Sequence, residues 1–162
     1  MNANKSSTDK SEIRNPGAPW ATAIAAGLAA GTAYLGAMWL DNKLSSWQFN
    51  DLKLVGQMFT TRSPFWQLQG LAGHYGFSVL MALAYARYAR QRLPGPGWLR
   101  GVLFLLLENV ALYPAGLIVD RMHAGIKAGQ LPPLLHPKTF AGQVLRHIAF
   151  GTALGLICKN EK

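Results

Sequence analysis

The long apolar stretches of this sequence contain four ionisable residues: His74, Glu108, Arg146 and His147. If such a stretch crosses a membrane, a lone charge within it costs at least about 2.5 to 3.5 kcal/mol. We therefore expect these side chains to face the interior of a helix bundle and to find partners there. Because opposite charges offset each other's desolvation, the sequence predicts an ion pair between Glu108 and Arg146.

Polar neighbours extend this group into a cluster, since each lies one helical step (i, i+4) from a partner. The predicted hydrogen-bonded pairs are His74 with Ser78, Asn109 with Tyr113, and Gln143 with His147. Polar residues between membrane helices often do no more than fix the packing of those helices. The sequence leaves open whether this intramembrane polar cluster is structural or functional.

Three kinds of chemistry fit the cluster. The first is a proton or ion pathway in an oligomer, because histidines and a desolvated carboxylate can take up and release protons. A second is a b-type haem ligated by His74 and His147, because imidazole nitrogens serve as axial ligands. The third is a membrane-embedded enzyme acting on lipid or isoprenoid, although the sequence has no HExxH, GxSxG, paired-aspartate or Walker-like motif.

No metal site, catalytic residue or other cofactor is predicted. His123 and His136 have no acidic or cysteine partners clustered around them in the sequence, so we expect both to be solvated loop residues. The single cysteine, Cys158, excludes an intrachain disulfide and any all-cysteine metal site.

The composition indicates a membrane protein. Apolar residues make up 50% of the 162 residues and charged residues only 14%, and the apolar ones fall into blocks of about 20. A net charge of +9 in a soluble protein suggests nucleic acid as a partner. Here no basic patch is interleaved with base-stacking aromatic residues, so we predict contacts with membrane lipids and no nucleic-acid binding.

The elements that must position the cluster are four transmembrane helices, which form one all-α bundle over residues 18–158. The helices are expected at residues 20–40, 65–86, 101–119 and 139–158, since about 20 apolar residues cross a bilayer. Residues 41–64 are too polar to span and place apolar residues at helical spacing, which predicts an interfacial amphipathic segment. Pro114 is expected to kink the third helix. Residues 1–17 are expected to be a disordered cytoplasmic tail, and residues 159–162 a cytoplasmic C-terminus.

Basic residues predict the orientation. With the N-terminus inside, the cytoplasmic segments carry nine Lys and Arg residues, against six in the outer loops. The loop from Arg87 to Arg100 contributes most, and we expect it to lie against anionic lipid. In the first helix, Gly27 and Gly31 form a GxxxG step that favours close packing within the chain over homodimerisation. The sequence thus predicts a multi-pass protein of the bacterial cytoplasmic membrane with both termini inside.

Several short motifs follow one another along the chain. They are a GLAAG run in the first helix, Arg62-Ser63-Pro64, Ala72 to His74, a Pro96 to Gly101 step, a Tyr113 to Leu117 step, and His147 in the last helix. In this order they resemble the YagU-like family of bacterial inner-membrane proteins, although the outer loop is shorter here. The resemblance implies a four-helix inner-membrane protein linked to acid resistance, with no established enzymatic activity. It makes His74 and His147 shared positions without giving them a role.

The function favoured by the sequence is that of a small non-enzymatic membrane protein. It would work in envelope or pH homeostasis, or as an accessory subunit of a membrane complex with a protein partner or a second copy. The alternative is a haem-binding or catalytic bundle that uses His74 and His147.

Overall fold

The computed structural model describes residues 19–158, so the predicted tail and C-terminus lie outside the described residues. Within this range the chain is all-α, as predicted. The helices are α1 (Pro19–Leu44), α2 (Asp51–Gly56), α3 (Trp66–Ala84), α4 (Gly97–Leu112), α5 (Gly116–Met122), α6 (Ala124–Lys127) and α7 (Pro137–Ile157). A π-helical turn (Tyr85–Ala89) extends α3, and a 3-10 turn (Tyr113–Ala115) joins α4 to α5.

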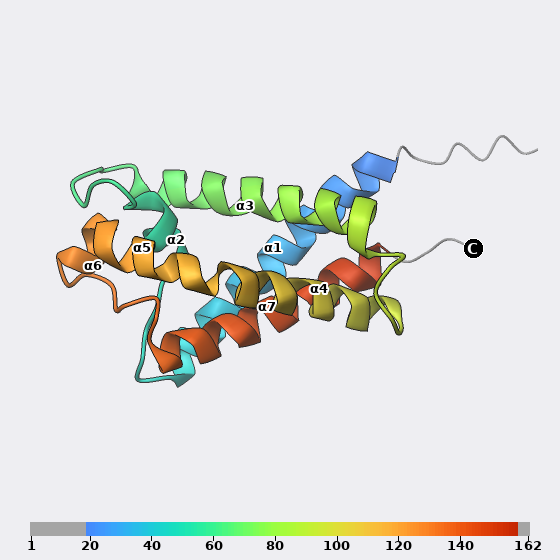
Figure 1. Cartoon of the computed structure of the whole chain (residues 1–162). Helices are drawn as coiled ribbons and strands as arrows, with labels where there is room; N and C mark the ends of the chain where they lie inside the picture. Colours follow the sequence, from blue (N-terminus) through green and yellow to red (C-terminus); the bar gives the residue numbers. More distant parts are fainter. Residues whose placement is uncertain (1–18, 159–162) are drawn as a thin grey trace, which may run out of the picture.

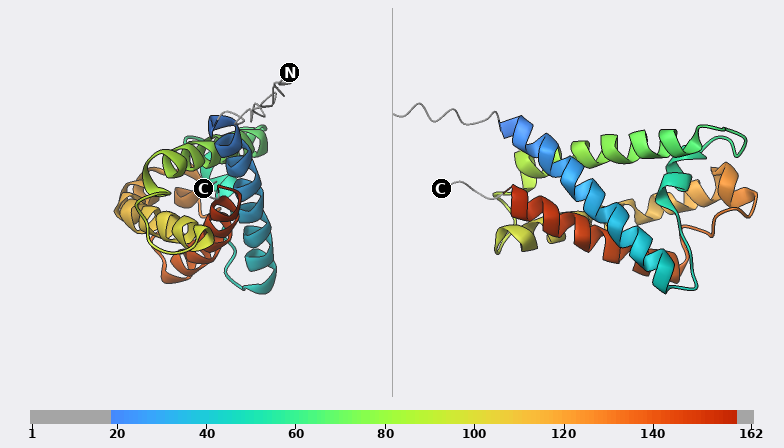
Figure 2. Two further views of the ribbon diagram at one scale, coloured as in Figure 1. Left: turned by 90° about the vertical axis from the view of Figure 1, so that its right-hand side faces the viewer. Right: turned by 180° about the vertical axis from the view of Figure 1, so that it is seen from behind.

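Four helical rods run lengthwise: α1, α3, α4 continued by α5, and α7 (Figure 1). Helix α7 packs between α4 and α1, and α1 packs between α7 and α3. Helix α1 begins and α7 ends at one end of the bundle, where α3 also turns into α4 (Figure 2). We call this the terminal end. The opposite end, which holds α2 and α6, is the loop end.

Three helical rods are long and apolar enough to cross a membrane, namely Trp20–Leu44, Gly97–Met122 and Pro137–Ile157. Even the shortest, at 21 residues, is about 32 Å long, which matches the hydrocarbon thickness of a bilayer. Large apolar side chains such as Leu107 and Ile118 are exposed on their outer faces. The expected fourth span is not confirmed, because α3 is not among the described helices that are long and apolar enough to cross a membrane.

The third rod is interrupted at Pro114, where the sequence predicts a kink. Proline has no N–H group to continue the α-helical pattern, and the backbone forms a 3-10 turn over Tyr113–Ala115. Helix α5 follows directly, so that α4, the turn and α5 make up a single candidate span.

The helical segment expected over residues 41–64 is present but shorter than predicted. Helix α1 takes the first residues of this segment, and only the six residues of α2 are helical beyond it. Helix α2 packs closely on α3, since a Cβ on Gly70 would collide with the carbonyl oxygen of Leu52. Phe49 and Asp51 are buried. Part of the segment is therefore packed inside the loop end, whereas Leu44 and Phe59 are exposed.

Helices α4 and α7 approach each other through two facing GxxxG steps that sequence reasoning overlooked. Gly97 and Gly101 lie on α4, and Gly151 and Gly155 lie on α7. A Cβ on Gly101 would collide with the carbonyl oxygen of Gly151, and a Cβ on Gly155 would collide with that of Gly97. Only glycine permits two helix backbones to come this close.

The step that the sequence does single out, Gly27 and Gly31 on α1, faces α3 of the same chain. A Cβ on Gly27 would lie 2.8 Å from the carbonyl oxygen of Ser78, and a Cβ on Gly31 would lie 2.7 Å from the Ser78 Oγ. Small residues thus set the distance between α1 and α3 as well.

Replacing Gly101 with alanine should lower the free energy of unfolding by about 1 to 3 kcal/mol, because the added methyl group forces α4 away from α7. The matched control is Gly36→Ala, since a Cβ there meets nothing within 4 Å. That variant should be neutral or more stable by up to about 1 kcal/mol, because alanine favours the helix. Denaturant unfolding in a mild detergent measures both, and equal stability of the two variants would contradict the close contact.

Candidate functional site

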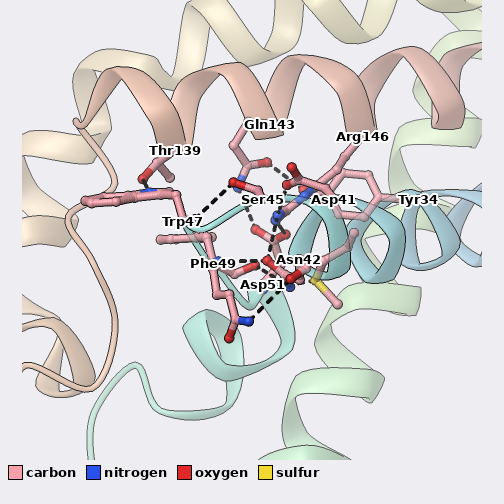
Figure 3. Close-up of polar contacts among 12 residues, drawn as sticks. Tyr34, Asp41, Asn42, Ser45, Trp47, Phe49, Asp51, Thr139, Gln143 and Arg146 are labelled. Atoms are coloured by element: carbon pink, nitrogen blue, oxygen red, sulfur yellow. Dashed lines mark hydrogen bonds and ion pairs between the residues drawn. The ribbon is translucent and has the colours of Figure 1, made fainter.

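Arg146 of α7 organises the loop-end half of the bundle, although only 1% of its surface is exposed. Its guanidinium donates one hydrogen bond to Asp41 Oδ2, from Nη2 at 2.6 Å, and another from Nη1 to Asp51 Oδ2 (Figure 3). Asp41 lies in the last turn of α1 and Asp51 is the first residue of α2. One buried side chain therefore joins three helices through charge-assisted hydrogen bonds.

The expected ion pair between Glu108 and Arg146 is wrong. Glu108 Oε2 instead lies 3.1 Å from Nε2 of His147. Arg146 and His147 are neighbours on a helix, so their side chains project about 100° apart. Arg146 therefore faces α1 and α2 while His147 faces α4, and a match in membrane depth does not reveal this rotation.

Local hydrogen bonds hold Asp51 in place. The Asn42 side chain forms two hydrogen bonds with the backbone of Phe49. It accepts the Phe49 N–H at 2.9 Å and donates to the Phe49 carbonyl oxygen at 3.1 Å. Asn50 then caps α2 by accepting the N–H of Lys53 at 3.0 Å. These contacts turn the chain back into the bundle directly after α1, and they aim the Asp51 carboxylate at α7.

Gln143 connects this carboxylate to the bundle interior. Its Nε2 donates to Asp51 Oδ1 at 2.6 Å, and its Oε1 accepts a hydrogen bond of 2.6 Å from the Tyr34 hydroxyl. The expected pairing of Gln143 with His147 occurs through the backbone, with His147 Nδ1 2.7 Å from the Gln143 carbonyl oxygen. Nearby, Trp47 Nε1 donates to Thr139 Oγ1 at 3.0 Å and fixes the loop to α7.

The Tyr34 ring packs against both His74 and His147. Its centroid is 5.2 Å from that of His74 and 5.5 Å from that of His147. A cavity of about 150 Å³ opens beside these three rings and reaches Asp51. His74 also places its Nε2 3.0 Å from the carbonyl oxygen of Gly31, which ties α3 to α1. The candidate site is this set of groups, centred on Tyr34.

A haem between His74 and His147 does not fit these residues. The Tyr34 ring contacts both imidazoles, and each Nε2 atom already has a partner, the Gly31 carbonyl oxygen and Glu108 respectively. The cavity of about 150 Å³ is also smaller than the 300 to 1,000 Å³ that is typical of ligand pockets. Among residues 19–158, no group of three or more His, Cys, Asp or Glu side chains is arranged to hold a metal ion.

The other residues expected in the cluster are placed differently. Ser78 Oγ donates to the backbone carbonyl oxygen of His74 at 2.8 Å. This bond lies within α3 and does not involve the His74 imidazole. Asn109 Nδ2 is buried and has no hydrogen-bond partner among the described residues. Tyr113 packs edge-on against Phe140, with 4.8 Å between ring centroids. No hydrogen bond joins Asn109 to Tyr113 in the described part of the chain.

The two loop histidines are structural, and the expectation that both are solvated is wrong. His123 is fully buried, with its Nδ1 accepting the N–H groups of Gly125 and Ile126 and its Nε2 lying 2.6 Å from the Leu54 carbonyl oxygen. This geometry caps α6 and joins it to the end of α2. His136 stacks on Trp47 with 4.0 Å between ring centroids.

The buried core of the terminal-end half is apolar. It consists of alanine, leucine and aromatic residues from α1, α3 with its π-helical turn, α4 and α7: Ala26, Ala30, Ala82, Tyr85, Leu105, Phe150 and Leu154. An apolar core therefore separates the polar groups described above from the terminal end. The described residues show no chain of hydrogen bonds from one end of the bundle to the other.

A scan against models of protein families finds no match to this chain, and neither do searches of curated proteins and of solved structures. The site is therefore interpreted from its own chemistry.

Sequence reasoning missed three members of the site: Tyr34, Asp41 and Asp51. Tyr34 and Asp41 are seven residues apart and share a helix face. Extending the predicted first helix by one turn would therefore have placed Asp41 on the same face as Tyr34. Asn50-Asp51 has the residue types of a helix start. The polar character of residues 41–64 instead favoured a surface location.

Arg146→Met should lower the free energy of unfolding by about 3 to 5 kcal/mol, because it leaves two buried carboxylates without a cation. The double variant Asp51→Asn/Arg146→Met should lose less than the sum of the two single losses, by about 1 to 3 kcal/mol. Glu108→Gln combined with Arg146→Met is the control and should show a smaller coupling than the Asp51 pair, since no ion pair or hydrogen bond joins Glu108 to Arg146. Denaturant unfolding measures the cycle, and coupling to Glu108 but not to Asp51 would contradict this pairing.

Proposed function

We propose that this chain is a non-enzymatic, four-helix protein of the bacterial cytoplasmic membrane that binds protons at its buried site and works in pH homeostasis of the cell envelope. The observation that carries the proposal is the charge balance of the site. Three largely buried carboxylates, those of Asp41, Asp51 and Glu108, accompany a single arginine. With both imidazoles neutral, the site has two more negative than positive charges.

His147 is the group at which the site would bind a proton. Protonation of His147 would convert its 3.1 Å contact with Glu108 into an ion pair and would reduce the charge imbalance. Imidazole is also the side chain that ordinarily changes charge in the physiological pH range. The Tyr34 ring touches both histidines and its hydroxyl bonds to Gln143, so a charge change at His147 reaches the Arg146 network through direct contacts.

The path of the chain supports a fourth crossing by α3. Helix α1 runs from the terminal end to the loop end, yet α4 starts again at the terminal end (Figure 1). If α1, α4–α5 and α7 all cross the membrane, the chain must cross back between Leu44 and Gly97. Helix α3 is the element that makes this return, and its 19 residues are about 29 Å long. Its exposed Leu68, Phe77 and Leu80 suit contact with lipid.

Orientation follows from the arginines between α3 and α4, which put the terminal end in the cytoplasm. The loop end then faces the outside, where external acid arrives first. The Asp41 side chain is 17% exposed and forms the outermost part of the site. The apolar core of the terminal-end half favours proton binding over proton conduction through a single copy of the chain. The resemblance to the YagU-like family, with its link to acid resistance, agrees with this role.

The role in acid resistance is testable in the bacterium that makes the protein. A strain lacking the protein should survive acid shock less well than its parent, and the wild-type chain should restore survival. Glu108→Gln and His147→Gln should fail to restore it while reaching the membrane in normal amounts. Asn109→Ala is the control, because it changes the neighbour of Glu108 without removing a titratable group. Full rescue by Glu108→Gln would rule out this site as the proton sensor.

The proton-binding step is testable separately with the purified protein in lipid nanodiscs. The ¹⁵N NMR signals of His147 should change from a neutral to a protonated imidazole when the sample is acidified, because a proton converts its contact with Glu108 into an ion pair. His123 serves as an internal comparison, because its Nδ1 accepts two backbone hydrogen bonds. A His147 ring that stays neutral in acid, like that of His123, would contradict the proposal.

A further inference from the structure

A second cavity lies at the terminal end, remote from the buried charges. It encloses about 420 Å³ and is lined by residues of the α3–α4 turn, the start of α4 and the end of α7, including Arg90, Gly97, Trp98, Arg100 and Cys158. This volume falls within the 300 to 1,000 Å³ of typical ligand pockets. We call it the arginine cavity.

Two arginines, Arg90 and Arg100, line this cavity. The Nε atoms of Arg90 and Arg100 are buried and have no hydrogen-bond partner among residues 19–158. Arg100 Nη1 donates to the backbone carbonyl oxygen of Arg90 at 3.1 Å, which ties the Arg100 side chain to the α3–α4 turn. No described carboxylate forms an ion pair with either residue. Two guanidinium groups thus bring positive charge to one cavity without a described counterion.

Other parts of the wall also suit an anion. Helix α4 begins at Gly97 without a side-chain cap, so the N–H groups of its first turn and the positive end of its dipole lie at the cavity. Burial raises the pKa of the Cys158 thiol above its ordinary value, although the nearby Arg90 lowers it. The thiol is therefore neutral near pH 7 and does not compete as an anion.

We propose that the arginine cavity binds a phosphate-bearing anion, held by the guanidinium groups of Arg90 and Arg100 and by the first turn of α4. Guanidinium groups match phosphate oxygens in charge and geometry. Trp98 is half-exposed at the start of a candidate span, where amphipathic rings meet lipid headgroups. An anionic phospholipid and a soluble phosphate share this chemistry, and the experiments below separate them. The site does not depend on the proposed function at the loop end.

The first experiment is native mass spectrometry of the full chain released from nanodiscs made of equal parts phosphatidylglycerol and phosphatidylcholine. The wild type should retain phosphatidylglycerol in preference. Arg90→Gln/Arg100→Gln should lower that retention on the order of tenfold, because two basic contacts to the headgroup are lost. Arg90→Lys/Arg100→Lys keeps both charges and should keep most of it. The matched control is Arg87→Gln, since Arg87 is exposed over the Tyr88 ring and does not line the cavity.

The second experiment uses the wild type alone. Cys158 is the only cysteine and lines the cavity, so an occupant should slow its reaction with a small neutral thiol reagent. Protection by phosphatidylglycerol but not by inorganic phosphate identifies a lipid as the occupant, and the reverse identifies a soluble phosphate. Equal retention of both lipids together with no protection by either anion would overturn the proposal. So would a loss of retention in Arg87→Gln as large as in the cavity variant, because binding would then be diffuse.

Discussion

The guanidinium of Arg146 lies between the carboxylates of Asp41 and Asp51, and the loop-end half of the protein depends on this arrangement. An arginine this deeply buried is costly without partners, so the structure must bring carboxylates to it. The Asp41 carboxylate comes from the last turn of α1, which extends beyond the apolar stretch. The Asp51 carboxylate reaches Arg146 only because the chain turns back into the bundle after α1, and the hydrogen bonds between the Asn42 side chain and the Phe49 backbone hold this turn.

The two halves of the bundle are held together by different physics. At the loop end, charged and polar side chains specify which helices meet. At the terminal end, glycines of α4 and α7 allow the backbones to touch, and alanines and Tyr85 fill the remaining space. The buried carboxylates and the two histidines beside Tyr34 therefore lie on one side of an apolar core. That division suits the proposed role in proton binding, and the arginine cavity lies at the opposite end of the bundle.

Much of the fold follows from sequence periodicity and hydropathy, because the bilayer imposes length and composition on each span. The three apolar helices and the break at Pro114 are of this kind. The partners of Arg146 are not predictable in the same way. Counting residues along a helix gives the depth of a side chain in the membrane, but it does not give the direction in which that side chain points around the helix axis. Asp51 was missed because a polar segment that folds inward looks, in composition, like one that stays outside. His123 was missed for the same reason.

The contact between Arg146 and the two aspartates is best tested by solid-state NMR of the protein in lipid bilayers, with ¹⁵N in the arginine side chains and ¹³C in the carboxylates. Dipolar couplings are expected from the Arg146 guanidinium to the Asp41 and Asp51 carboxyl carbons, and Asp51→Asn and Asp41→Asn should each shift one of these signals. Coupling of Arg146 to the Glu108 carboxyl carbon in place of the aspartates would show that this three-helix contact does not form.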